Sequence, residues 1–153
     1  MIQLKPMPEA DFKAYLEVLI PDYAQENVKS GRWTAEEALA ASRAEIDKLL
    51  PDGLATENQY LFNIVADEET QPVGILWFAV DKGKAFVYDI VTYDAFRRRG
   101  YATQALLIME DKARQMGLNT ISLHVFGNNH AARVLYQKLG FVETNVMMSK
   151  TLD

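Results

Sequence analysis

Three consecutive arginines and a glycine stand where an apolar, helix-forming run begins. The stretch reads Phe96-Arg97-Arg98-Arg99-Gly100-Tyr101-Ala102-Thr103 and is followed by QALLIME. The first N–H groups of a helix have no partner within the helix and lie at the positive end of its dipole, so anions bind there. Gly100 can adopt a positive φ, Ala102 is small, and Thr103 can donate a hydroxyl. We therefore expect residues 97–103 to bind phosphate. Arg98 and Arg99 either form charge-assisted bonds to it or only solvate the turn.

A second candidate pair lies near the C-terminal end, in the stretch Asn129-His-Ala-Ala-Arg-Val-Leu-Tyr136. Asn129 and Tyr136 are seven residues apart, which is about two helical turns, so a helix would place both on one face. Asn129 offers an amide, and Tyr136 offers a phenol that can donate a proton to a leaving anion. Without the arginine-rich turn, Asn129 would be interpreted as a helix cap and Tyr136 as a core aromatic residue.

The composition limits the class of protein that could carry such sites. The chain has 153 residues, 49% of them hydrophobic, which predicts a single globular domain over residues 1–153. It has no cysteine, which excludes disulfides, a thiolate metal site and a cysteine nucleophile. The net charge of −5 argues against a general nucleic-acid binder. The first residues resemble no secretory signal and no run is long enough to span a membrane, so we expect a cytoplasmic protein without a membrane partner.

The elements that would position these residues follow from the hydrophobic spacing. We expect a short strand at residues 2–7, then a helix from Glu9 to about Val28 that Pro21 bends or breaks. Thr34 and Glu37 form a capping box that opens a second helix, which ends before Pro51. Three strands follow in an antiparallel meander, and these are Gln59 to Ala66, Pro72 to Val80, and Ala85 to Thr92.

After Thr92 the spacing of the hydrophobic residues alternates between the period of a helix and that of a strand. Residues 102–116 predict a helix that Gly117 ends, and Thr120 to Phe126 predict a strand. A helix capped by Asn128 or Asn129 and ended by Gly140 comes next, and Phe141 to Lys150 form a last strand. The order β-α-α-β-β-β-α-β-α-β predicts an α/β domain with a mixed, mostly antiparallel sheet flanked by helices.

Together these motifs resemble the GNAT superfamily of N-acetyltransferases. The acetyl-CoA signature of that family, R/Q-x-x-G-x-G/A, is matched by Arg97-Arg-Arg-Gly100-Tyr-Ala102. Its later N-x-x-A-x-x-x-Y-x-K-x-G-F run is matched by Asn129, Ala132, Tyr136, Lys138, Gly140 and Phe141. The chain looks most like small, uncharacterised, single-domain bacterial members. It departs from the commonest form at Arg98, often glycine, and at Asp94, often proline.

The resemblance implies roles for the matched residues. It implies a GNAT-like fold, in which the strand before the turn splays from its neighbour at a bulge and offers main-chain groups to the pantetheine arm of acetyl-CoA. Those groups would come from Ile90, Val91 and Thr92. The pyrophosphate would be held by Arg97, Arg98, Arg99, Gly100, Tyr101, Ala102 and Thr103. Asn129 would contact the cofactor, and Tyr136 would protonate the departing thiolate. A neutral amine would attack the thioester directly, and no metal is required.

The resemblance leaves the general base and the acceptor open. Asp89 is the candidate base, with a pKa raised by desolvation, and His124 or a water molecule is the rival. The first two helices would form the acceptor side, with Tyr15, Tyr23, Arg32 and Trp33. The acceptor is a small-molecule or peptide amine, and exposed sheet edges are compatible with a homodimer.

Two other functions compete with acetyl transfer. One is a non-catalytic module that binds acyl-CoA or regulates through it, which the presence of Tyr136 disfavours. The other is an anion-binding domain for nucleotides or RNA, which the acidic balance and the lack of a basic, aromatic face disfavour.

Overall fold

A five-stranded sheet forms the centre of the structure, a computed structural model that describes residues 1–152. The strands, in their order across the sheet, are β1 (Ile2–Pro6), β2 (Gln59–Ala66), β3 (Gly74–Asp81), β4 (Lys84–Thr92) and β5 (Thr120–Leu123). The first four pair antiparallel, and β5 pairs parallel to β4. A parallel pair needs a crossover connection, and here a helix provides it. The predicted mixed, mostly antiparallel α/β fold is confirmed.

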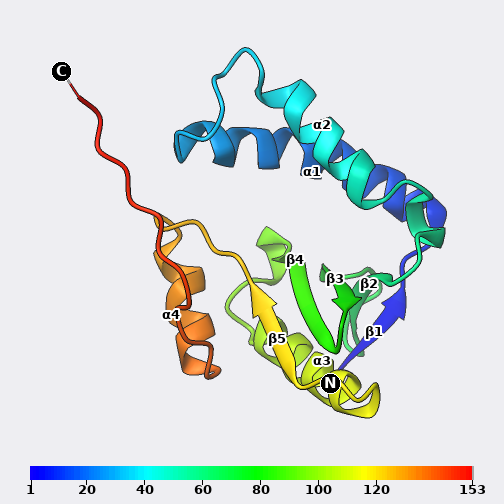
Figure 1. Ribbon diagram of the computed structural model, residues 1–153. Helices are drawn as coiled ribbons and strands as arrows, with labels where there is room; N and C mark the ends of the chain where they lie inside the picture. The colour runs from blue at the N-terminus through cyan, green and yellow to red at the C-terminus, as the bar shows by residue number, and fades with distance from the viewer. Residues whose placement is uncertain (153) are drawn as a thin grey trace.

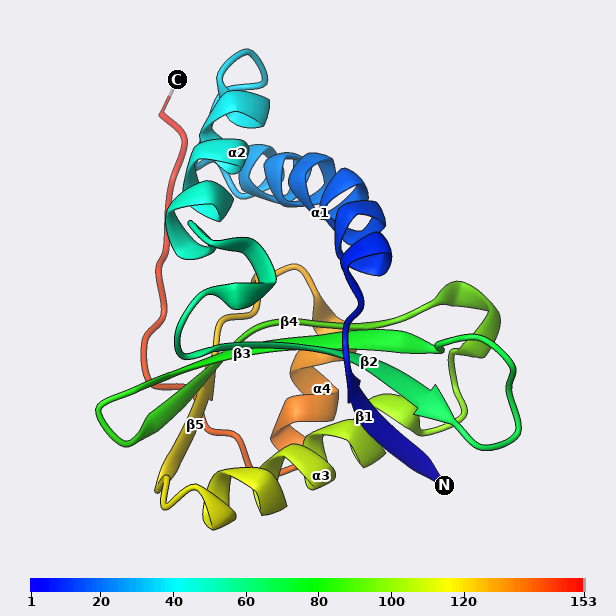
Figure 2. The same ribbon diagram turned by 90° about the vertical axis from the view of Figure 1, so that its right-hand side faces the viewer.

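Four helices flank this sheet. They are α1 (Glu9–Lys29), α2 (Ala38–Leu49), α3 (Tyr101–Gln115) and α4 (His130–Lys138), with 3-10 turns at Gly53–Ala55 and Asp94–Phe96. Helices α1 and α2 lie over one face of the sheet. Helix α3, which connects β4 to β5 along the chain, lies on the opposite face, and α4 lies beyond β5 (Figures 1 and 2). Within residues 1–152, none of the helices combines the length and the apolar character needed to cross a membrane.

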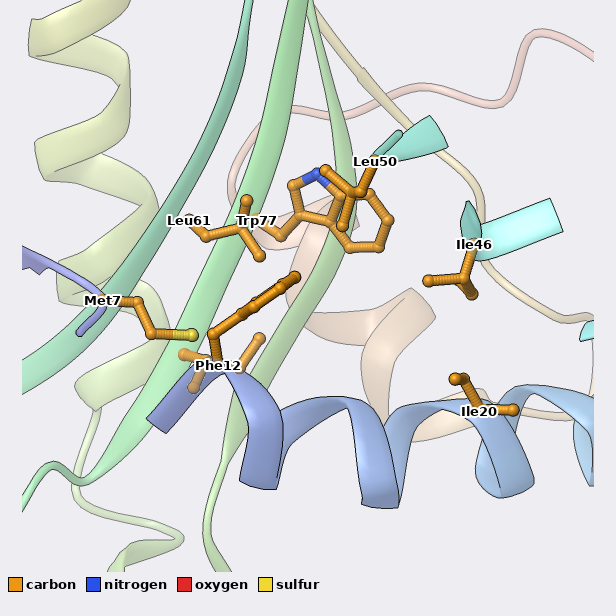
Figure 3. Close-up of a cluster of buried hydrophobic side chains, with 8 residues drawn as sticks. Met7, Phe12, Ile20, Ile46, Leu50, Leu61 and Trp77 are labelled. Carbon is orange, nitrogen blue, oxygen red and sulfur yellow. The ribbon is translucent and has the colours of Figure 1, made fainter. Parts of the chain in front are cut away.

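A hydrophobic cluster joins α1 and α2 to the sheet (Figure 3). Its buried members are Met7, Phe12, Ile20, Ile46, Leu50, Leu61, Ile75 and Trp77. Trp77 is only 1% exposed, and its indole N–H donates to Oε1 of Gln59 at 2.7 Å, so burial leaves no unpaired donor. Because Trp77 pairs with Asp89 in the β3–β4 ladder, this cluster fixes α1 above the middle of β4.

The opposite face of the sheet is covered by α3. Tyr101 and Ala105 pack against β1, β2 and the start of β3, whereas Leu106 and Met109 pack against β3 and β4. Tyr101, Ala105 and Met109 recur at every fourth position with Leu106 beside them, as the predicted amphipathic helix requires. All buried hydrophobic residues of the described chain lie between Ile2 and Ala113. The segment after α3 therefore adds no fully buried apolar side chain.

The local predictions that rest on turns and caps are confirmed. Strand β2 has the predicted bounds, and β3 and β4 differ from theirs by one or two residues. In the capping box the N–H of Glu37 donates to Oγ1 of Thr34 at 3.3 Å, and the N–H of Thr34 donates to Oε1 of Glu37 at 3.2 Å. Gly117 and Gly140 follow α3 and α4 with φ of 77° and 94°, so both helices end as expected.

Three predictions need correction. Of the two outcomes expected at Pro21, a bend or a break, the break is excluded. Helix α1 continues through Pro21, because Pro21 and Glu17 are exposed and the Glu17 carbonyl that loses its donor can be hydrated. Strand β5 ends at Leu123 instead of Phe126. The predicted last strand, Phe141 to Lys150, is absent: residues 141–152 form neither helix nor strand within one chain. They leave α4 in a direction away from the sheet (Figure 1).

Candidate active site

The neighbouring strands β4 and β5 separate halfway along β4. They pair from Lys84–Thr120 to Val87–Leu123, and beyond Val87 the structure pairs β4 only with β3. The register of the β3–β4 pair shifts at the same point. Trp77 lies opposite Asp89 and Phe78 lies opposite Val87, so Tyr88 is the extra residue of a β-bulge. The expected splay and bulge are both observed. They leave one side of the main chain at residues 90–92 without a strand partner.

A carboxylate lies at this bulge. Asp89 is partly buried, and its Oδ2 accepts a hydrogen bond of 2.6 Å from the phenol of Tyr15 on α1. Burial raises the pKa of Asp89 to about 6, although the hydrogen bonds from Tyr15 and from the main chain of Ile90 act in the opposite direction. Asp89 is thus ionised at neutral pH, with a basicity closer to neutrality than an exposed carboxylate has.

Three phenols from separate parts of the chain lie close enough to Asp89 to feel its charge. Tyr15 comes from α1, Tyr93 follows β4, and Tyr136 comes from α4. The pKa of each is raised, first by burial, and the negative charge of Asp89 contributes in all three cases. All three phenols therefore stay protonated at neutral pH and can act as hydrogen-bond donors. The sequence identified Asp89 and Tyr136 as separate candidates, and the structure brings them into one electrostatic group.

The arginine-rich turn leads from this group to the start of α3. Gly100 is the N-cap residue of α3 with φ of 79°, and no side chain caps the helix. A Cβ added at Gly100 would meet no atom within 4 Å, so the space on the side-chain side of this residue is open. Uncapped N–H groups at the positive end of a 15-residue helix suit an anion.

The three arginines of the turn differ in their partners. Arg97 pairs with Asp94 at 3.1 Å, and its Nε donates to the Thr92 carbonyl at 3.3 Å. Arg99 pairs with Glu69 at 3.0 Å. Arg98 is exposed, has a φ of 65°, and forms no hydrogen bond or ion pair with other residues in the range 1–152. Arg98 is therefore the guanidinium that an incoming anion can engage without displacing a carboxylate.

Two other predicted cofactor residues have structural tasks. The ring of Tyr101 is buried against the sheet and its hydroxyl donates to Oε1 of Glu68 at 2.5 Å, so its side chain has a structural role. Asn129 caps α4, since its Oδ1 accepts from the N–H of Ala132 at 3.2 Å, which leaves its amide nitrogen as a donor. Thr103 and Ala102 lie in the first turn of α3 and are partly exposed.

The remaining candidates lie outside the group around Asp89. His124 follows the end of β5 and is exposed, with its ring packed edge-on against Phe126. On the expected acceptor side, Arg32 pairs with Glu45 and stacks 4.7 Å from the centre of the Trp33 ring. Tyr23 also donates to Glu45 and contacts Trp33 edge-on. These contacts stabilise the loop between α1 and α2.

Two site residues could not be assigned from the sequence. Tyr15 was expected only as a wall of the acceptor side, and Tyr93 was not singled out. Tyr15 is a long-range partner of Asp89 that no local motif marks, whereas Tyr93 lies only four residues after Asp89 in the sequence. Among residues 1–152, no group of three or more His, Cys, Asp and Glu side chains is placed to hold a metal ion.

Comparison with known proteins gives concordant matches. Residues 13–141 match the model of the acetyltransferase (GNAT) family. The uncharacterized N-acetyltransferase YycN of Bacillus subtilis is 41% identical, and the alignment covers 99% of each chain. Its crystal structure matches with a TM-score of 0.94 over 99% of both chains. YdgE, an uncharacterized N-acetyltransferase of the same organism, is 36% identical over 97% of each chain.

A more distant solved structure has the same fold. The PaiA N-acetyltransferase of Thermoplasma acidophilum, in complex with coenzyme A, is 17% identical with a TM-score of 0.71. The match covers 96% of this chain and 93% of that one.

Proposed function

The chain belongs to the GNAT family of acetyltransferases, and on this premise we propose that it transfers the acetyl group of acetyl-CoA to a primary amine by direct attack in a ternary complex. The observation that carries the proposal is the convergence of Asp89 and Tyr136 beside the splay, next to an uncapped helix with an open space at Gly100. A base, an acid and an anion seat are the three groups that this reaction needs.

The phosphate seat consists of the turn and the first residues of α3. The N–H groups of residues 101–103 would bind the pyrophosphate of acetyl-CoA, helped by the free guanidinium of Arg98. Arg97 and Arg99 would mainly hold the turn in shape through Asp94 and Glu69, and Thr103 can add a hydroxyl. The open space at Gly100 fits this use, because a bound phosphate needs close approach to the main chain.

The splayed half of β4 supplies main-chain partners for the rest of the cofactor. Ile90, Val91 and Thr92 have no strand partner on the β5 side, so they can bind the pantetheine arm as an added strand would. An N–H group of the same segment would stabilise the oxyanion that forms when the amine attacks the thioester carbonyl. Asn129 would contribute its unused amide donor from the start of α4.

Asp89 is the proposed base. An alkylamine is protonated at neutral pH and must lose a proton before it attacks. Asp89 can accept that proton directly or through water, since a carboxylate has more lone pairs than the bonds from Tyr15 and Ile90 use. His124 does not fit this role in the described geometry, because it lies exposed beyond the end of β5.

Tyr136 is the proposed acid. Its raised pKa keeps the phenol protonated, so it can donate to the thiolate of CoA as the thioester breaks. Its ring packs edge-on against Phe141, with ring centres 5.8 Å apart, which restricts the orientation of the phenol.

The charge on the α1 side favours a cationic acceptor. The negative charge of Asp22 contributes to the raised pKa of Asp89, and that of Asp11 contributes to the raised pKa of Tyr93. Such a concentration of carboxylates raises the local concentration of a protonated amine. A small-molecule amine and a peptide amine both carry this charge.

The test begins with calorimetric titration of the purified protein with acetyl-CoA, desulfo-CoA and ATP. We expect micromolar binding of both CoA ligands and much weaker binding of ATP. An amine panel assayed for release of free thiol then tests transfer, with Asp89→Asn as the control that keeps the Tyr15 contact but has no basic carboxylate. No CoA binding by the folded protein would overturn the proposal. Binding with no thiol release from any amine would favour a non-catalytic acyl-CoA module.

A further inference from the structure

The β-bulge places two consecutive side chains of β4 on the same face of the sheet. In a regular strand, neighbouring side chains alternate between the two faces. Val87 and Ile90 pack with residues of α3, whereas Asp89 accepts its hydrogen bond from α1 on the other face. The extra residue, Tyr88, stacks on Trp77 of the cluster under α1, with ring centres 4.7 Å apart. The bulge therefore brings an aromatic ring next to the proposed base, on the α1 side of the sheet.

A hollow of about 330 Å³ continues from Tyr88 along this face. Its floor contains a row of three residues that pair across the sheet, which are Ala79 of β3, Phe86 of β4 and Ser122 of β5. The two outer residues are small, so they leave room on both sides of the Phe86 ring. Phe86 meets Tyr88 edge-on, with ring centres 4.9 Å apart, and Tyr88 is 38% exposed. The two rings thus form an apolar wall that a ligand can reach from solvent.

One acid and one base lie at the far end of the hollow, where β3 turns into β4. Asp81 and Lys84 are partners in the strand ladder, and both line the hollow and are exposed. Among residues 1–152, neither forms an ion pair with the other or with a third side chain. Figure 2 shows this hairpin projecting beyond α1 and α2. Because the two charges cancel, this end favours a neutral group that both donates and accepts hydrogen bonds over a second ammonium group.

We propose that the acceptor in the acetyl transfer proposed above, on which this inference rests, is a primary arylalkylamine. Its nitrogen lies at Asp89 and its ring lies in the hollow against Phe86 and Tyr88. A strand rises about 3.3 Å per residue, so Phe86 is roughly 10 Å from Asp89 along β4, which suits a ring joined to the nitrogen by two carbons. The nitrogen bonds to the acetyl carbon as the C–S bond breaks, its proton goes to Asp89, and the thiolate takes a proton from Tyr136.

The wall of the hollow determines which amines should react fastest. Aromatic rings pack favourably on Phe86 and Tyr88, and burial of a ring removes apolar surface from water. A phenolic hydroxyl on the ring can reach the polar end formed by Asp81 and Lys84. A polyamine or an aminoglycoside has no apolar body to place on the wall. We therefore expect 2-phenylethylamine and tyramine to be better acceptors than either of those.

Free-thiol release measured with matched amines tests this substrate class. We expect kcat/KM for 2-phenylethylamine to exceed that for propylamine, which has no ring, about tenfold or more. Equal values for these two amines would overturn the arylalkylamine assignment and leave acetyl transfer itself intact. A higher value for a polyamine, an aminoglycoside or a peptide amine would overturn the assignment as well.

A variant that fills the hollow shows whether the preference arises there. Ser122 is exposed and lies beside Phe86, so Ser122→Trp should occupy the hollow and reduce the ratio of the two kcat/KM values about tenfold. Comparing the ratio between proteins removes any difference in basicity between the amines. Gln3→Trp is the matched control, since Gln3 is an exposed strand residue on the same face at the opposite edge of the sheet, and it should keep the ratio. An unchanged ratio in Ser122→Trp would contradict the proposal.

Binding is measured separately from turnover, so that failure of acetyl transfer can be recognised. In the presence of saturating CoA, saturation-transfer NMR should detect 2-phenylethylamine on the wild type and on Gln3→Trp but not on Ser122→Trp. Acetyl-CoA binding without thiol release from any amine would refute the transfer, and the NMR result would then decide alone whether the hollow binds the arylalkylamine. Thiol release from propylamine with no NMR signal from 2-phenylethylamine would refute only the substrate class.

Discussion

The phenol of Tyr15 donates a hydrogen bond of 2.6 Å to Oδ2 of Asp89, although the two residues are 74 positions apart in the sequence. The contact joins the first helix to the bulge of β4. It also lowers the pKa of Asp89 against the larger effect of burial, which raises it to about 6. The pair therefore sets the pH range in which the proposed base is ionised.

Removal of this phenol should change the pH dependence of the reaction. Tyr15→Phe removes a bond to the charged carboxylate, so the pKa of Asp89 should increase above about 6. The acidic limb of the profile of kcat/KM against pH should then move to higher pH, because a larger fraction of Asp89 is protonated at each pH. Tyr23→Phe, which loses a bond to Glu45 instead, should leave the limb in place. An unmoved limb in Tyr15→Phe would rule out Asp89 as the titrating base.

Loss of the Tyr136 phenol should affect turnover more than binding. Tyr136→Phe keeps the ring against Phe141 but removes the proposed proton donor. General acid catalysis contributes about a hundredfold or more, so kcat should fall by roughly that factor while the Kd for acetyl-CoA stays near the wild-type value. Tyr60→Phe, at a ring that stacks on Phe78, is the control and should retain full turnover. Single-turnover acetyl transfer at the wild-type rate would show that Tyr136 is not the acid.

A charge placed at the helix start should separate binding from stability. Gly100 and Gly117 lie at opposite ends of α3, with φ of 79° and 77°, and an added Cβ meets no atom within 4 Å at either. Gly100→Glu should abolish acetyl-CoA binding by calorimetry, because a carboxylate would occupy the anion seat. Gly117→Glu carries similar backbone strain and an unfavourable charge at the C-terminal end, so it should lose stability by about 1–2 kcal/mol yet bind normally. Equal affinities in the two variants would exclude the seat at Gly100.

The free arginine of the turn gives a further prediction. Arg98→Gly relieves the strain of a left-handed backbone conformation, with φ of 65°. The free energy of unfolding should therefore stay within about 1 kcal/mol of the wild type. The affinity for acetyl-CoA should fall about tenfold or more, since a hydrogen bond to a charged group is lost. Lys82→Gly changes the same charge at an exposed residue with φ of 50° in the β3–β4 hairpin, and it should not change the affinity. Unaltered binding in Arg98→Gly would assign the arginine to solvation of the turn.

The parts of the fold that depend on local chemistry could be predicted from the sequence. Polar turn sequences bound β2, β3 and β4, and the reciprocal bonds of Thr34 and Glu37 start α2, so these elements lie where the sequence placed them. The arginine-rich turn and the Asn129 cap are local in the same sense. Their spacing alone sufficed to find them.

The features that were missed depend on contacts between distant segments. The role of Tyr15 requires knowledge of where α1 crosses β4, and the Trp77 cluster that fixes this crossing combines residues from four elements and the loops beside them. The strand at Phe141 to Lys150 has the right alternation but no partner in one chain, so periodicity alone could not decide its pairing. Pro21 was overvalued as a helix breaker because its exposure could not be read from the sequence.

The confinement of the buried core to residues 2–113 implies an order of events during synthesis. The ribosome releases the chain from its N-terminal end, and compact units can fold before translation is complete. We expect the sheet from β1 to β4 and its three helices to form while the last segment is still inside the ribosome. Strand β5 and helix α4 would then be added to a folded body.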